Sequence, residues 1–333
     1  MDPYARIDAI LIFACGLLAL LKITCFRIYS DNLSSNFKSA INDYFAVDNE
    51  EKRFVMRRHA FMGRMICYCV VCVAYVGSIF YVSLPLVIGH KSIQINGSVV
   101  VPNTIYPVPS TCSLGSLSIP TSLHILLFLW QSVVLFSIST GNLGGDSLFL
   151  AITLHVCGQM EILKVEFANF GVKSLNPKED FSKMVTRHQH LLIQALLLCD
   201  TISSVLVLQL LISSLLICII GFQLIVAVKV GDTIMIAKTA WVQLTLLSQI
   251  FAYSYVGDYM KSQIEEIANA IFSSNWYCFS FKMMRNVVFV IARSQDPVQL
   301  MAAKFIVINM ETFMSIIKTS LSYLSVLRVM VEV

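Results

Sequence analysis

The last 23 residues, ETFMSIIKTSLSYLSVLRVMVEV, form an apolar segment that carries polar side chains at helical spacing. The polar positions are Ser315, Lys318 or Thr319, Ser322 and Ser325. Intervals of three and four place them on one face of a helix. A lysine at the centre of a membrane helix costs about 2.5–3.5 kcal/mol on insertion scales, so this face should contact protein or water. Two alternatives follow: helix–helix hydrogen bonding, or a water-filled pore built from several copies of the helix, which Val326 and Met330 would close by excluding water.

Other side chains that could take part in catalysis or metal binding do not form a convergent set. Asp146 falls within an apolar run, where a carboxylate indicates function; alternatively it lies near the inner end of its span and reaches water. The pair His188 and His190 has no evident third ligand, and Cys69-x-x-Cys72 has no second pair. We therefore expect no catalytic site, no metal and no cofactor, and the chain is predicted not to be an enzyme.

Aromatic residues gather in the outer halves of several apolar segments. Tyr75 and Phe80 lie in one of them, Trp130 and Phe136 in the next, and Trp241 in a third. Aromatic and apolar walls with a few hydroxyls suit a small-molecule pocket. An aromatic belt at the membrane interface, or plain helix packing, would give the same pattern.

Composition indicates the elements that must position these residues. Of 333 residues 57% are apolar and 13% are charged, against about 45–50% and 25% in soluble domains. The net charge of +4 is small, and nucleic acid is not an expected partner. A spanning helix needs about 20 mostly apolar residues. Six segments qualify, which predicts an all-α polytopic bundle in the lipid bilayer: 7–26, 66–88, 122–150, 192–228, 236–257 and 305–330.

Lysine and arginine predict the orientation, because cytoplasmic flanks carry them in excess. Segments 22–64, 158–191 and 258–304 hold eighteen, against three in the alternate connections. These three segments are therefore predicted inside and both chain ends outside. The sequon at Asn96 falls in a connection predicted to be extracellular, which makes Asn96 a candidate glycosylation site.

The inner segments should also be helical. Apolar residues recur at helical spacing through 259–272, so the fifth span is expected to continue into the cytoplasm. The segment 158–191 is expected to extend the third and fourth spans in the same way. A compact cytoplasmic helical layer is thus predicted below the membrane.

Several stretches resemble the insect odorant receptors, and the resemblance covers nearly the whole chain. QIFAYSYVGDYMKSQIEEIANAIFSSNWY (249–277) is similar to that family's sixth helix and the cytoplasmic helix after it. ARSQDPVQLMAAKFIVINMETFMSIIKTSLSYLSVLRVM (292–330) resembles its seventh helix with the lead-in. LHVCGQMEILK (154–164) and the run 188–225 match the ends of its fourth helix and its fifth. The sequence as a whole is similar to the receptors of ants, bees and wasps.

The resemblance implies an odorant-binding tuning subunit of a ligand-gated, non-selective cation channel. Its partners would be a volatile odorant and the olfactory co-receptor in a heterotetramer, with no G protein. It would lie in the plasma membrane of olfactory neuron dendrites, with the C-terminus extracellular and a topology inverted relative to G-protein-coupled receptors. By depth and face, the odorant pocket is expected at Tyr75, Ser78, Trp130, Val134 and Trp241. The pore and gate are expected at Ser322, Val326 and Met330.

The resemblance also divides the chain. Residues 1–257 would form the transmembrane bundle, with inner connections 27–63 and 158–191. Residues 258–304 would form the cytoplasmic anchor. Residues 305–333 would form the pore-lining helix with a short extracellular end. The family has seven spans, so its first helix is expected to be missing here, and the first span of this chain to correspond to the second. Alternatives are a small-molecule transporter, or a gustatory-type receptor of the same superfamily.

Overall fold

The computed structural model describes residues 3–47, 49–88, 94–95, 98–99, 106–108, 120–170 and 176–332. Long α-helices make up most of this part of the chain. Five of them are long and apolar enough to cross a membrane. They are α1 (Pro3–Ile28), α3 (Glu50–Ile88), α5 (Thr121–Ala168), α6 (Pro177–Val230) and α7 (Thr233–Phe272). Two shorter helices, α2 (Ser30–Phe45) and α8 (Phe281–Ser294), a 3-10 turn, η1 (Trp276–Cys278), and a final helix, α9 (Met310–Glu332), complete the helical part.

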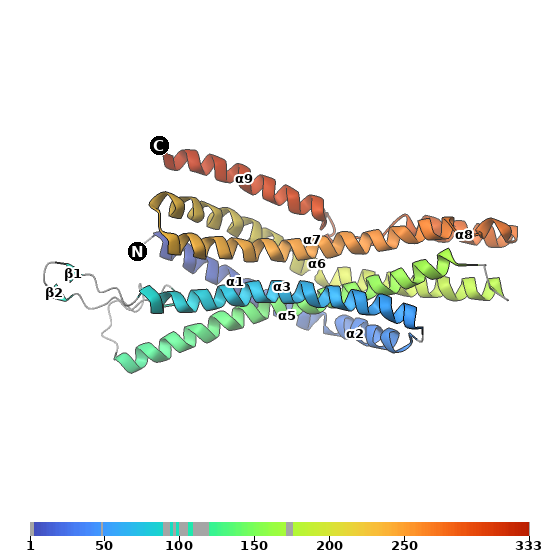
Figure 1. Ribbon diagram of the computed structural model, residues 1–333, viewed down its shortest axis with the longest axis horizontal. Coiled ribbons are helices and arrows are strands. Elements are labelled where there is room, and N and C mark those ends of the chain that lie inside the picture. Colours follow the sequence, from blue (N-terminus) through green and yellow to red (C-terminus); the bar gives the residue numbers. More distant parts are fainter. Residues whose placement is uncertain are drawn as a thin grey trace.

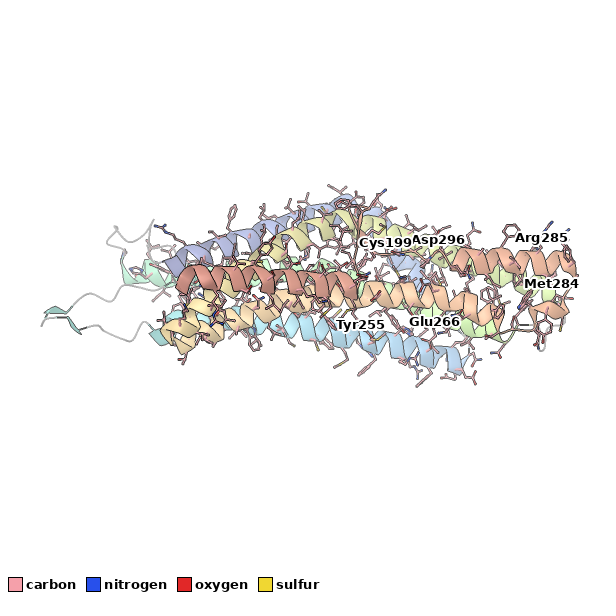
Figure 2. All side chains as sticks on the ribbon, turned by 90° about the horizontal axis from the view of Figure 1, so that it is seen from above. Cys199, Tyr255, Glu266, Met284, Arg285 and Asp296 are labelled. Atoms are coloured by element: carbon pink, nitrogen blue, oxygen red, sulfur yellow. The ribbon has the colours of Figure 1, made fainter. Side chains whose placement is uncertain are left out.

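The helices lie roughly along one long axis (Figure 1). Both termini lie at one end of the bundle, called here the terminal end, and α8 lies at the other, the α8 end. Helix α9 occupies only the terminal half, beside α6 and α7. Five of the six predicted spans thus fall in helices that are long and apolar enough to cross a membrane, and the sixth corresponds to α9, which runs beside them (Figure 1 and Figure 2).

The predicted continuation of the spans is confirmed. Helix α5 runs on to Ala168, α6 begins at Pro177 and α7 ends at Phe272. At about 1.5 Å per residue, the 54 residues of α6 extend roughly 80 Å, far beyond the ~30 Å of a bilayer core. The α8 half is therefore a helical layer that continues the spans beyond membrane thickness.

Ion pairs between helices hold this layer together. Glu166 of α5 accepts from Lys52 of α3 at 2.5 Å and from Arg187 of α6 at 3.0 Å. Lys164 of α5 contacts Glu266 of α7 at 2.6 Å. These pairs are partly exposed, so each contributes modestly. Their main effect is to fix the position of α5 along the bundle axis, because each pair joins α5 to a different helix, α3, α6 or α7.

The lead-in to α9 differs from the predicted span 305–330. Strands β3 (Met301–Ala302) and β4 (Ile306–Val307) form a short antiparallel hairpin, and α9 begins only at Met310. The turn between the strands uses positive φ at Ala303 and Lys304 (49° and 64°), which ends the extended path of β3. The first helical N–H of α9, from Met310, is accepted by Asp258 of α7 at 3.2 Å. The start of the last helix is thus fixed against α7. A second hairpin, β1 (Gln94–Ile95) with β2 (Ser98–Val99), lies between α3 and α5.

Candidate functional site

Four helices of the terminal half line a cavity of about 130 Å³. One apolar wall comes from α1 and α5, for example Leu11 and Leu135, and the other from α3 and α7, where Ala74 and Leu246 contribute. An engineered cavity of about 150 Å³ holds benzene. The cavity therefore suits a compact ligand with the bulk of a single ring.

Trp241 forms one side of the cavity because α3 leaves room for it. Gly77 faces the indole, and a Cβ added there would lie 3.0 Å from Cδ1 of the ring. The indole Nε1 donates to the carbonyl oxygen of Val73 at 2.8 Å, one turn earlier on α3. Close approach of α3 and α7 beside the cavity thus depends on a glycine, and the bond from Trp241 to Val73 joins the two helices there.

The structure brings together two of the five predicted ligand residues. Ser78 and Trp241 line the cavity. Tyr75 instead hydrogen-bonds to Thr140 at 2.7 Å, Trp130 is 68% exposed, and Val134 is half-buried; none of these three is among the lining residues. Tyr75 and Ser78 both hydrogen-bond to α5, at Thr140 and Ser139, but only Ser78 borders the cavity.

Hydroxyl groups form the polar part of the wall. Ser78 Oγ lies 2.7 Å from Ser139 Oγ of α5 and donates to the carbonyl oxygen of Ala74 at 3.1 Å. Thr245 Oγ1 donates to the carbonyl oxygen of Trp241 at 3.0 Å. Each of these bonds lies within the protein, so the wall is polar but internally satisfied.

A buried ion pair lies one helical turn beyond the cavity, towards the terminal end. Lys238 of α7 contacts the carboxylate of Asp8 of α1, with side chains 6% and 9% exposed. The same ammonium lies 4.7 Å from the centroid of the Tyr81 ring, which lines the cavity. By sequence position, Lys238 falls among the charges of a connection. The pairing was not foreseen, because nothing local links residues so far apart.

A second buried pair lies on the other side of the cavity, deeper in the bundle. Lys22 of α1 donates to Asp146 of α5 at 2.6 Å and to the carbonyl oxygen of Asn142 at 3.2 Å. The side chains of the pair are 1% and 4% exposed. Of the two alternatives for Asp146, the one in which it reaches water is therefore wrong. Lys22, which lies in the segment predicted to be inside, is buried against it. Burial without a partner would cost each charge several kcal/mol, which is why the two groups lie together.

Comparison with known proteins places this geometry in a family. A model of the 7tm odorant receptor family matches residues 4–321. The chain belongs to this family. Odorant receptor 9a of Drosophila melanogaster is 30% identical over 63% of this chain and 54% of its own length, and odorant receptor 13a of the same fly is 25% identical over 62% and 53%. The chain thus spans about half the length of these curated relatives.

A solved structure agrees on the fold. The insect olfactory receptor OR5 from Machilis hrabei, in complex with eugenol, superposes with a TM-score of 0.79. The match covers 98% of this chain and 82% of that one at 15% sequence identity. The fold is therefore the seven-helix membrane fold of odorant receptors.

In this odorant receptor chain, α9 turns its polar face away from its own bundle. Phe313 and Ile316 pack towards the core, whereas Lys318, Ser322 and Val326 are exposed. No ion pair joins Lys318 to any residue of the described part of the chain. Within the described residues, the only hydrogen bond of the stripe joins Ser325 to Ser322 inside α9. The side chain of Met330 lies outside the described residues, as does Asn96.

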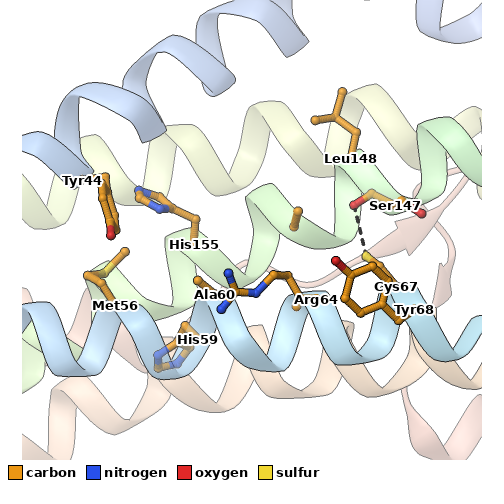
Figure 3. Close-up of a pocket in the computed structure, with 12 residues that line it drawn as sticks. Tyr44, Met56, His59, Ala60, Arg64, Cys67, Tyr68, Ser147, Leu148 and His155 are labelled. Atoms are coloured by element: carbon orange, nitrogen blue, oxygen red, sulfur yellow. Dashed lines mark hydrogen bonds between the residues drawn. The ribbon is translucent and has the colours of Figure 1, made fainter.

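A larger cavity, of about 470 Å³, lies nearer the α8 end between α2, α3 and α5 (Figure 3). Its walls include Tyr44 from α2, Arg64 from α3 and His155 from α5, and the Cys67 thiol beside it donates to the carbonyl oxygen of Ser147 at 3.5 Å. None of the predicted ligand residues lines it. It does not belong to the site in the terminal half.

The predicted histidine pair separates. His188 is buried against Phe167, with ring centroids 6.4 Å apart, while His190 contacts Ser39 at 3.1 Å. Within the described residues no group of three or more His, Cys, Asp or Glu side chains is placed to hold a metal ion.

Proposed function

We propose that this chain is an odorant-binding tuning subunit of a ligand-gated, non-selective cation channel assembled with the olfactory co-receptor. It would act in the plasma membrane of olfactory sensory neuron dendrites, with the terminal end extracellular. The observation that carries the proposal is the cavity between α1, α3, α5 and α7. It is mostly apolar with a few hydroxyls, as a site for a small volatile molecule requires.

Helix α7 supports a route from ligand to pore. It carries Trp241 at the cavity, and it carries Gly257 and Asp258 at the start of α9. A Cβ at Gly257 would lie 2.5 Å from the carbonyl oxygen of Ile308, so the lead-in to α9 is packed directly on the α7 backbone. A tilt of α7 at the cavity would therefore move the start of α9. The ligand would open the channel only if it bound the open arrangement better than the closed one.

The exposed face of α9 supports a pore role. Ser322 and Val326 point away from the rest of this chain, as they would in a helix that lines an axis shared with other subunits. Val326 and Met330 are the proposed gate. The extracellular C-terminus remains part of the proposal, because it rests on the distribution of lysine and arginine.

The test is whole-cell recording from cells that co-express this chain with an insect odorant co-receptor, during application of a broad odorant panel. We expect a cation current that cells with co-receptor alone do not give. Trp241→Ala should shift the dose–response curve, and Val326→Ala should alter conductance at unchanged odorant sensitivity. Tyr75, Trp130 and Val134 remain predicted ligand residues that the same recording tests. Good surface expression without any evoked current would contradict the proposal.

A further inference from the structure

A cavity and a groove on the two sides of α5 share one wall. The cavity is the one of about 470 Å³ that Arg64 lines (Figure 3). The groove, of about 450 Å³, lies between α2 and α5. They form one continuous hollow, called here the α5 hollow, because four residues line both: Tyr44, Leu148, Ala151 and His155.

The α5 hollow lies at the depth predicted for the inner membrane boundary. Arg64 lies just before the predicted span 66–88. Leu148 and Ala151 lie on either side of residue 150, where the predicted span 122–150 ends. Helix α2 follows the first predicted span and falls in a segment predicted to be inside. All three helices thus pass from apolar to charged sequence near this level.

The groove side of the hollow is apolar and exposed. Phe37, Ile41 and Phe45 recur at intervals of four on α2 and are 48%, 39% and 77% exposed. All three lie outside the predicted spans, so contact with the bilayer core does not account for their exposure. An apolar face on a helix that lies beside the membrane is typical of contact with interfacial lipid.

The cavity side of the hollow carries a cation. Arg64 is exposed, and within the part of the chain that the structure describes no ion pair holds its guanidinium. In contrast, Arg58 of the same helix is paired with Glu161 of α5. A planar guanidinium can donate two parallel hydrogen bonds to a phosphate. Arg64 is therefore available to an anionic group that enters the cavity.

The other polar groups of the cavity wall add no positive charge. Burial lowers the pKa of His155, so its ring is neutral at pH 7; Asp43, which does not line the hollow, acts in the opposite direction to a smaller extent. His155 Nε2 is buried without a hydrogen-bond partner among the described residues. Tyr44 and Tyr68 contribute hydroxyl groups. The wall thus combines one cation with neutral hydrogen-bonding groups, as a phosphate with a hydroxylated head group requires.

We infer that the α5 hollow binds an anionic phospholipid of the inner leaflet, with the phosphate at Arg64 and an acyl chain against Phe37 and Ile41. The inference takes from the proposed function only the orientation, in which the α8 half is cytoplasmic. Anionic lipids are concentrated in the cytoplasmic leaflet. A zwitterionic lipid carries the same phosphate, but Arg64 repels its cationic head group. The bound lipid would join α2 to α3 and α5 at the membrane boundary.

The test titrates the purified full chain, in a non-ionic detergent, with dioleoylphosphatidylglycerol or dioleoylphosphatidylcholine. Native mass spectrometry counts the lipids bound. We expect the first site to be half-filled at a roughly fivefold lower concentration of phosphatidylglycerol, which is the effect of one cation beside an anionic lipid. Arg64→Gln should reduce this ratio to about one. Arg64→Lys should keep most of it, because the charge remains.

Two further variants separate charge from apolar contact. Arg285→Gln is the matched control, since it removes the same charge from an exposed position of α8, far from the hollow (Figure 2). It should keep the parent's ratio. Ile41→Gln changes an exposed position of the groove, so the chain should fold normally. This variant should bind both lipids more weakly at an unchanged ratio.

Several results would overturn the inference. They are a parent with no preference for phosphatidylglycerol, or a preference that Arg64→Gln retains or that Arg285→Gln loses to the same extent. Displacement of the lipid by an equal concentration of glycerol 3-phosphate would indicate a site for soluble phosphate esters instead. Dimers that Ile41→Gln dissociates would assign the hollow to a second copy of the chain. Odorant-evoked current is recorded separately, so these outcomes leave the channel proposal standing.

Discussion

Replacing Asp146 with asparagine should destabilise the bundle strongly. The change keeps the shape of the side chain but removes the negative charge, so Lys22 stays buried beside a neutral amide. Because the two side chains are only 1% and 4% exposed, solvent cannot compensate. Removing one partner of a buried pair typically costs about 3–5 kcal/mol, which would change the ratio of folded to unfolded protein by a factor of more than about 100.

The assay is thermal unfolding of the purified chain in detergent, followed by the loss of a monodisperse chromatographic peak. At about 2 °C or more per kcal/mol, the single variant should lower the midpoint by at least roughly 5 °C. The double variant Lys22→Met, Asp146→Leu removes both charges and should recover most of that loss, because replacing a whole buried pair by apolar groups is often neutral or better.

An exposed pair provides the control. Glu179 and Lys183 of α6 are 60% and 69% exposed and lie 2.8 Å apart at i, i+4. Glu179→Gln should leave the unfolding midpoint almost unchanged, because solvent screens an exposed pair. If Asp146→Asn unfolds within 1–2 °C, roughly, of the parent, or if the double variant is no better than the single, the pair does not stabilise the bundle as argued.

Three further predictions concern the cavity and the start of α9. Gly257→Ala should abolish odorant-evoked current at normal surface labelling, because its Cβ would lie 2.5 Å from the backbone oxygen of Ile308; a normal current would contradict the coupling through α7. Gly77→Ala should raise the half-maximal concentration of bulky odorants more than that of small ones, since it pushes Trp241 into the cavity, and parallel shifts for both would count against this. Lys238→Met should lower the unfolding midpoint by several degrees, because it leaves a buried carboxylate unpaired, and an unchanged midpoint would exclude a stabilising role.

The fold was largely predictable because its signals are local. Apolar runs of sufficient length specified where α1, α3, α5, α6 and α7 lie, and helical periodicity beyond them specified how far they continue. The hairpin before α9 was missed because the segment from Phe305 to Ile308 is apolar enough to resemble the start of a span. Its conformation is set by the positive-φ turn at Ala303 and Lys304 and by contact with α7, and apolar composition reports neither.

The candidate site was only partly predictable because its signals are not local. Lys22 and Asp146 are 124 residues apart, and Asp8 and Lys238 are 230 apart. Each charge alone looks like a flanking residue or an isolated intramembrane group. Depth along a helix follows from sequence, which is why two of the five predicted residues, Ser78 and Trp241, lie at the cavity. Sequence does not show which face of a helix points inward, because that depends on which helices lie beside it.

The size of the cavity limits how the proposed channel can be gated. For a ligand of about seven non-hydrogen atoms, a ceiling of about −1.5 kcal/mol per atom allows a total binding free energy near −10 kcal/mol. Moving a two-state equilibrium from 1:99 to 99:1 requires about 5.5 kcal/mol of differential affinity. For a ligand that fills about 130 Å³, the binding free energies for the open and closed states would then have to differ by half of the largest total that such a ligand can reach. It follows that the closed state can be favoured over the open one by only a few kcal/mol. A contact such as that of Gly257 with the lead-in to α9 must therefore be close to balanced between the two states.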